Sequence, residues 1–115
     1  MKKIKIKRIY EEPSENDGYR ILVDRLWPRG VSKEDAALDD WNKDVAPTEK
    51  LRKWFDHDTD KFTEFEKKYR KELEGKTTDL DEIKNKAQNQ RVTLLYGAKD
   101  TEHNQAVVLQ KLLNK

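Results

Sequence analysis

The stretch that decides the fold is the sequence RVTLLYGAKDTEHN, residues 91–104. Its first part, residues 92–96, is a nearly continuous apolar run, which is typical of a strand buried on both faces of a sheet. Gly97 and a short polar loop follow, and we expect a helix to begin near Thr101. Backbone N–H groups at the start of a helix are free to bind an anion. The stretch therefore predicts a central strand that ends at the floor of a site.

The composition predicts one folded domain with an ionic surface. The chain has 115 residues, a length that fits a single domain spanning residues 1–115. Charged residues make up 42% of it, against about 25% in an average protein, yet the net charge is only +2. Ten aromatic residues (three Trp, three Phe and four Tyr) argue against disorder. The small basic excess permits an anionic ligand and argues against nucleic acid, which calls for a pI above about 9 and a clustered basic stripe.

The absence of cysteine excludes several kinds of site and fits a protein of the reducing cytoplasm. Without Cys, the chain has no disulfide, no zinc–thiolate site and no cysteine nucleophile. No apolar run approaches the roughly 18 residues that a membrane span needs. The first residues, Met-Lys-Lys, lead into an alternating segment rather than the apolar region of a signal peptide. We therefore expect a cytoplasmic protein with no membrane partner.

The order of the remaining elements predicts an α/β fold. An alternating half-exposed strand opens the chain, and a more apolar strand, residues 19–24, follows a turn-rich loop. Several helical segments then precede the strand at residues 92–96, and this order favours a small, mostly parallel sheet flanked by helices. A fourth strand is expected within residues 39–47. The expected helices are residues 32–38, 48–55 and 60–73, one capped by Thr78, and residues 101–113.

The loop from Asp24 to Gly30 is the first candidate site. In open α/β sheets ligands bind beyond the carboxyl ends of strands, where this loop and the Gly97 loop would meet. Arg25 and Arg29 would hold a phosphate or carboxylate, and Trp27 would stack on the ligand. The alternative is structural: Asp24 pairs with an arginine, Trp27 packs in the core and Arg29 is a solvated rim residue.

The loop after the central strand is the second candidate. Gly97 is small enough to let a ligand approach the backbone, and Lys99, His103 and Asn104 supply donors near the helix start. The alternative is an ordinary strand-to-helix connection. His103 and His57 are the candidate acid–base groups, because an unperturbed histidine titrates near pH 6.5. Asp24 is the third candidate catalytic residue, with the alternative that it orients Arg25 or Arg29.

Two further patterns have simpler explanations. The segment DHDTD, residues 56–60, brings carboxylates to His57 as a metal or general-base site would, but Asp58 is also a good helix N-cap. We therefore predict no metal site. The basic cluster at the N-terminus (Lys2, Lys3, Lys5, Lys7 and Arg8) suits a nucleic-acid patch, but alternating lysines more often mark a solvated sheet edge. No GxGxxG, Walker-type or GxSxG motif is present, so no cofactor is expected.

Three blocks of the sequence resemble a known family. They are DGYRILVDRLWPRGV (17–31), LRKWFDHD (51–58) and VTLLYGAKD (92–100) with His103-Asn104. Together they resemble the YeaO-like proteins of the DUF488 class, small bacterial domains of unknown function. The resemblance covers nearly the whole chain and implies no reaction, because the family has no established activity. Related branches carry a Cys after the last strand, where this chain has Gly97-Ala98, so thiol chemistry does not carry over.

The functional prediction rests on the two converging loops. We predict a small anionic ligand, phosphate- or carboxylate-bearing, held by Arg25, Trp27, Arg29, Gly97, Lys99 and Asn104 at the strand carboxyl ends. The alternative is a non-enzymatic interaction domain, whose Trp and Arg side chains would form a protein-binding hot spot. The sequence carries no catalytic signature and leaves open both whether the protein is an enzyme and its oligomeric state.

Overall fold

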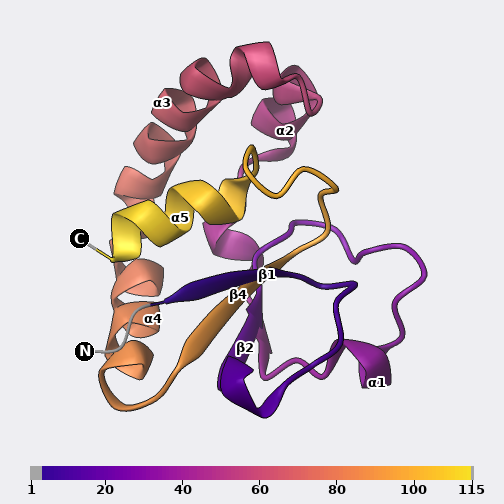
Figure 1. Ribbon diagram of the computed structural model, residues 1–115. Helices are drawn as coiled ribbons and strands as arrows, with labels where there is room; N and C mark the ends of the chain where they lie inside the picture. Colours follow the sequence, from indigo (N-terminus) through magenta and orange to yellow (C-terminus); the bar gives the residue numbers. More distant parts are fainter. Residues whose placement is uncertain (1–3, 115) are drawn as a thin grey trace.

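A four-stranded, all-parallel sheet forms the centre of the computed structural model, which describes residues 4–114 (Figure 1). The strands are β1 (Lys5–Arg8), β2 (Tyr19–Leu22), β3 (Asp40–Trp41) and β4 (Val92–Tyr96), in the spatial order β1-β4-β2-β3. The fold class is therefore α/β, as the sequence predicts. The two-residue strand β3 is the fourth strand expected within residues 39–47.

Strand β4 lies between β1 and β2, and all five of its residues are buried. Leu94 is in register with Ile6 on one side and with Ile21 on the other. This arrangement confirms the central strand that the apolar run predicts. Strand β1 is an edge strand, and Lys5 on it is exposed, whereas Lys2 and Lys3 of the basic cluster lie outside the described residues.

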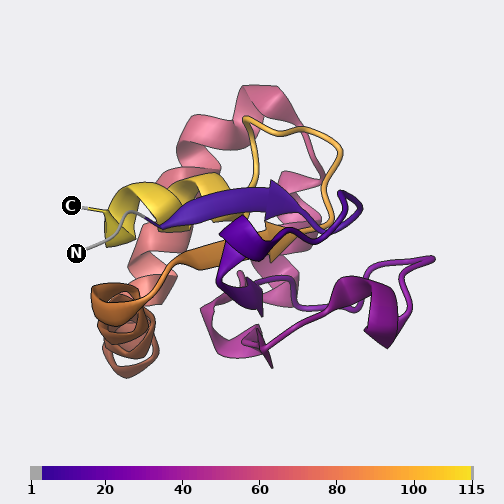
Figure 2. The same cartoon turned by 60° about the horizontal axis from the view of Figure 1, so that its bottom comes forward.

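The two faces of the sheet are covered unequally (Figures 1 and 2). Successive side chains of β4 point to opposite faces, so Leu94 joins a large core and Leu95 a small one. The small core lies under α1 and the loop before it, and it includes Leu22 and Ala36. The large core is covered by the other four helices. The helices are α1 (Lys33–Ala36), α2 (Glu49–Phe55), α3 (Phe62–Leu73), α4 (Thr77–Asn89) and α5 (Gln105–Leu113).

Two helix starts differ from the sequence prediction. Helix α5 begins at Gln105 rather than near Thr101, because Asp100 accepts hydrogen bonds from the N–H groups of residues 102 and 103 and folds them into a turn. Asn104 then caps α5 by accepting from the N–H of Val107. Helix α4 begins at Thr77 without a side-chain cap, directly after a 3-10 turn at residues 74–76, so Thr78 is not its cap.

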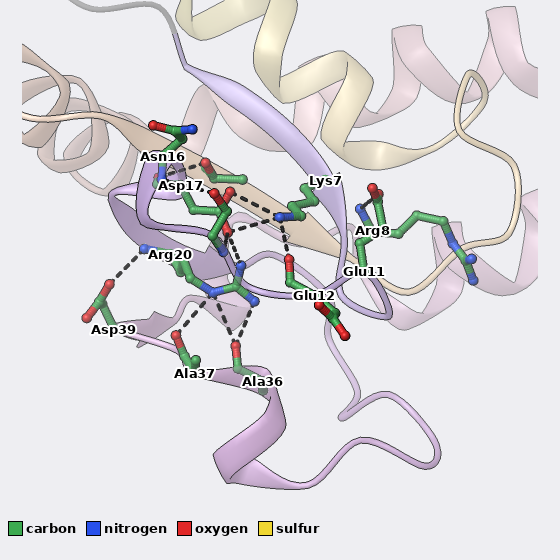
Figure 3. A network of polar contacts seen from close by, with 12 residues as sticks. Lys7, Arg8, Glu11, Glu12, Asn16, Asp17, Arg20, Ala36, Ala37 and Asp39 are labelled. Atoms are coloured by element: carbon green, nitrogen blue, oxygen red, sulfur yellow. Dashed lines mark hydrogen bonds and ion pairs between the residues drawn. The ribbon is translucent and has the colours of Figure 1, made fainter.

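A buried ion network fixes α1 to the small face (Figure 3). Asp17 and Arg20 are both buried, and Arg20 Nη1 donates to Asp17 Oδ2 at 2.5 Å. The same guanidinium donates to the carbonyl oxygens of Ala36 at 2.8 Å and Ala37 at 3.1 Å, at the end of α1. Lys7 adds a second cation, 3.2 Å from Asp17 Oδ2. Lys7 is therefore an ion-pair partner rather than a solvated edge residue.

The partners of Asp17 also decide its charge. Burial acts to raise the pKa of Asp17, but a hydrogen bond from the Ser14 N–H and those from Lys7 and Arg20 hold that pKa below its usual value. The carboxylate is therefore ionised and matched by cations at every pH where the protein would normally be studied.

Candidate functional site

A pocket of about 620 Å³ opens at the carboxyl ends of β2 and β4. This volume lies within the range of roughly 300–1,000 Å³ that is usual for small-molecule sites. The loop after β2, the loop after β4 and helix α2 all contribute to its wall. The lining residues are Tyr10, Asp24, Arg25, Leu26, Trp27, Pro28, Arg29, Pro47, Arg52, Lys53, Phe55, Asp56, His57, Phe65, Gly97, Ala98, Asn104 and Gln105.

Asp24 joins the two loops of the pocket. Its Oδ2 accepts a hydrogen bond from the Gly97 N–H at 2.9 Å, and its Oδ1 accepts one from the side-chain amide of Gln105. A Cβ added at Gly97 would lie 2.9 Å from Asp24 Oδ2, which is closer than real Cβ atoms approach. The small size of Gly97 thus serves the approach of Asp24 rather than that of a ligand.

Burial sets the direction of the pKa shift of Asp24, and the two donors to its carboxylate are neutral. Burial raises the pKa of Asp24 to about 6, and the hydrogen bonds from Gly97 and Gln105 and the charge of Arg52 offset only part of that rise. No salt bridge to Asp24 is formed among residues 4–114. Asp24 is thus a carboxylate that takes up a proton near pH 6 inside a pocket rich in cations.

Arg52 is the pocket residue that the sequence analysis does not single out. It lies on α2, next to the buried Leu51, and its Nε is buried without a hydrogen-bond partner in the described chain. Its guanidinium forms no salt bridge within residues 4–114. Only its position beside the apolar stripe of α2 could have drawn attention to it.

Arg25 and Arg29, the two predicted anion ligands, have different roles in the pocket. Arg25 donates from Nε to the carbonyl oxygen of Pro47 at 2.8 Å and from Nη2 to that of Ala46 at 3.4 Å, which ties it to the segment before α2. Arg29 is exposed, and its carbonyl oxygen accepts from the Tyr10 hydroxyl at 2.9 Å. Arg25 is thus a half-buried wall residue, and Arg29 lies at the rim, where its side chain has no hydrogen-bond or ion-pair partner among residues 4–114.

Trp27 belongs both to the pocket wall and to the small core. Its indole N–H donates to the carbonyl oxygen of Val31 at 2.7 Å, and its ring packs edge-on against Trp41 with centroids 5.3 Å apart. The Trp41 indole in turn donates to the carbonyl oxygen of Asp24 at 2.7 Å. These contacts agree with the structural alternative, in which Trp27 packs in the core, and part of the residue also lines the pocket.

The two histidines do not share one site. His57 is exposed, has φ of 55° and lines the pocket. His103 does not line it: its Nδ1 is 2.9 Å from Asp100 Oδ2, and its ring packs edge-on against Phe62. Lys99 is exposed and is likewise absent from the lining. Of the candidate acid–base groups, Asp24 and His57 are the two that line the pocket.

Three of the backbone N–H groups expected to hold an anion already have partners. The N–H groups of residues 102 and 103 donate to Asp100, and that of Gly97 donates to Asp24. The side chain of Asn104 is also occupied: its Oδ1 caps α5, and its Nδ2 donates to the carbonyl oxygen of Asp100 at 2.8 Å. The three N–H groups are therefore not free to hold an anion. Within residues 4–114, no group of three or more Asp, Glu or His is placed to hold a metal, and no helix is long and apolar enough to cross a membrane.

Comparison with known proteins identifies the family. The model of a family described as "Inactive DUF488-N3 subclade" matches residues 3–115, and the chain belongs to this family. The uncharacterized protein YeaO of Escherichia coli is 44% identical over 106 residues, covering 92% of each chain. The uncharacterized protein Rv3073c of Mycobacterium tuberculosis is 37% identical over 112 residues, or 97% of this chain and 94% of that protein. No solved structure matches the chain.

Proposed function

We propose that the pocket binds a small anionic ligand, phosphate- or carboxylate-bearing, through Arg52, Arg25 and Arg29. The observation that carries this proposal is the half-buried guanidinium of Arg52, which lines the pocket and forms no salt bridge in the described chain. A guanidinium without an anionic partner can form charge-assisted hydrogen bonds to the acceptor oxygens of a ligand, each worth about 1.5–3 kcal/mol. A guanidinium suits this role because it presents a planar set of donors to phosphate or carboxylate.

The charge of the pocket supports the same proposal. Four cationic side chains line it (Arg25, Arg29, Arg52 and Lys53), against two carboxylates, Asp24 and Asp56. Arg29 and Lys53 are exposed at the opening, where they would attract an anion before Arg52 binds it. The walls also include apolar side chains, which suit the body of a small molecule. They are Leu26, Trp27, Pro28, Pro47, Phe55, Phe65 and Ala98.

Binding without turnover fits the residues better than a reaction does. His103 lies outside the pocket lining and His57 at its exposed edge, and neither is hydrogen-bonded to Asp24 in the described chain. The family description, "Inactive", accords with a binding role. We therefore propose a ligand-binding domain, in which Asp24 and His57 contribute charge and hydrogen bonds.

Thermal unfolding with added anions tests the proposal. Inorganic phosphate, sulfate and acetate would each be titrated against the wild type, Arg52→Met, Arg29→Ala and the control Lys67→Ala, which removes an exposed cation from α3. A ligand at 100 times its dissociation constant adds about 2.7 kcal/mol to the free energy of unfolding. We expect a rise in Tm for the wild type and Lys67→Ala that Arg52→Met abolishes. Equal shifts in all four proteins would reject the pocket as the site.

The alternative of an interaction domain is favoured by a different surface. Trp54 on α2 is 37% exposed, and the ammonium groups of Lys61 and Lys68 lie 5.2 Å and 5.0 Å from its ring centroid. Exposed tryptophan with neighbouring cations is a frequent feature of protein-binding hot spots. If no anion shifts the Tm, loss of partner binding in Trp54→Ala would support this second function.

A further inference from the structure

We infer that the ligand is bipolar, with a hydrogen-bond-donating ammonium group for Asp24 and a phosphate or carboxylate group for Arg52. This inference rests on the proposed function, because it specifies the chemistry of the molecule that would fill the same pocket. In this proposal Asp24 makes the pocket prefer anions that also carry an ammonium group over anions that do not. An amino-alkyl phosphate or an amino acid is the simplest molecule with both groups.

The contacts of Asp24 leave acceptor capacity in the pocket. Each carboxylate oxygen can accept two hydrogen bonds, and the described chain supplies one to each, from Gly97 and from Gln105. Since Asp24 lines the pocket, the remaining acceptor positions are available to a ligand donor. A carboxylate that served only to orient an arginine would be paired with it, as Asp17 is with Arg20.

The relation between Asp24 and Arg52 points to two separate ligand groups. Arg52 is near enough for its charge to lower the pKa of Asp24, yet the two residues form no salt bridge. Each therefore remains an unpaired partner at the same pocket. A ligand that carried only negative charge would satisfy Arg52 but would meet repulsion from the ionised Asp24. A bipolar ligand would satisfy both.

The protonation of Asp24 gives a second way to test whether this residue favours ligands with an ammonium group. Above pH 6 Asp24 is ionised and attracts an ammonium group, and below pH 6 it is neutral and loses that attraction. The preference for a bipolar ligand over the matched plain anion should thus decline as pH falls. The other groups that share the pocket with Asp24 are the cations Arg25, Arg29, Arg52 and Lys53, together with Asp56 and His57. Tyr69 is also close enough to sense the charge of Asp24, but it is buried and donates to the Val45 carbonyl.

The test compares two matched pairs of ligands by calorimetry. The pairs are 2-aminoethyl phosphate with ethyl phosphate, and 3-aminopropyl phosphate with propyl phosphate, so that only the ammonium group differs within a pair. Each would be measured at pH 7.5 with the wild type, Asp24→Asn and the control Lys67→Ala. We expect the wild type and the control to prefer one amino ligand by about tenfold or more, as a charged hydrogen bond would give. Asp24→Asn should remove that preference.

Each other outcome overturns a specific claim. Equal affinity within both pairs would overturn the bipolar ligand and leave the anion site standing. A preference that survives in Asp24→Asn would overturn the role of Asp24. No binding of any of the four ligands would reject the proposed function together with this inference. If Asp24→Asn does not fold, the wild type still tests the bipolar ligand, because the preference for the amino ligand within each pair is measured without any variant.

Discussion

The two aspartates at opposite ends of strand β2, Asp17 and Asp24, have carboxylates in opposite electrostatic environments. Asp17, before β2, is bonded to Lys7 and Arg20, and its pKa is lowered. The carboxylate of Asp24, just after β2, receives hydrogen bonds only from Gly97 and Gln105 in the described chain, and its pKa is raised to about 6. The first arrangement stabilises a native contact, whereas the second retains an electrostatic cost at the edge of a pocket.

This difference indicates which of the two regions can bind a charged ligand. In the Asp17 network the charges of the protein satisfy one another, so no vacant partner is left for a ligand. In the Asp24 pocket, a carboxylate and the guanidinium of Arg52 lie near each other without pairing. Unmet charges and donors of this kind lower stability in the free protein, and a ligand can recover what was lost. Substitutions at the two aspartates and at their neighbours test this contrast.

The largest effect is expected from Arg20→Met, which removes the main partner of Asp17. The substitution leaves the buried carboxylate with one cation, Lys7, and the Ser14 N–H, and it removes the donors to the carbonyl oxygens of Ala36 and Ala37. Breaking a buried ion pair at one partner typically costs about 3–5 kcal/mol. Urea unfolding should show a loss of this size. A loss below about 1 kcal/mol would mean that the network is not a stabilising contact.

A second pair of substitutions compares the glycines beside the two aspartates. A Cβ at Gly18, which has φ of +64°, would lie 2.2 Å from the carbonyl oxygen of Arg91, which belongs to the backbone and cannot move easily. Gly18→Ala should therefore cost about 3 kcal/mol or more. A Cβ at Gly97 meets the side chain of Asp24 instead, so Gly97→Ala should cost about 1–2 kcal/mol. Chemical unfolding of both variants would contradict the comparison if the order were reversed.

The third prediction concerns the pH dependence of Asp24→Asn. The folded-state pKa of Asp24, about 6, is above the ordinary value of 3.8, so the carboxylate destabilises the native state at pH 8 by up to about 3 kcal/mol. That cost declines as pH falls from 6 towards 3.8, because the native state takes up the proton first. Asparagine can keep both hydrogen bonds if the Gln105 amide turns over. Asp24→Asn should therefore be more stable than the wild type at pH 8, by a margin that vanishes near pH 4.

Asp17→Asn is the matched control for that measurement, and its sign is opposite. The pKa of Asp17 is lowered, so its carboxylate stabilises the native state above pH 3.8, and this contribution is lost only as pH falls through the lowered pKa. Unfolding curves at pH 8 should show Asp17→Asn less stable than the wild type. If both substitutions shifted stability in the same direction, the electrostatic contrast between the two aspartates would be wrong.

The smallest effect on stability is expected from Arg29→Ala. Its side chain is exposed at the rim, and the contact from Tyr10 uses the backbone carbonyl oxygen, which the substitution retains. The free energy of unfolding should change by less than about 0.5 kcal/mol. Anion binding should weaken, and the loss should shrink at high salt because rim charges are screened. A large loss of stability would show that Arg29 is part of the fold rather than of the opening.

The sequence predicted the frame of this site more completely than its contents. The apolar run of β4 and the strand before Asp24 are local patterns, and parallel strands bring their carboxyl ends to one edge, so the meeting of the two loops follows from them. The polar partners of Asp24 are not local. Gln105 and Gly97 are far from Asp24 in the sequence. Arg52 lies on a helix, and no pattern in the sequence specifies that this helix packs beside the pocket.

The sequence alone was enough for the α/β class, the buried central strand and the edge at which a pocket forms, because hydrophobic periodicity is a local pattern and long helical connections between strands favour parallel pairing. Only the tertiary structure decided which charges meet. It paired Asp17 with Arg20, left Arg52 and Asp24 unpaired at one pocket, and turned His103 away towards Asp100. Electrostatic energies depend on separation and burial in space, and these quantities exist only once distant segments have packed together.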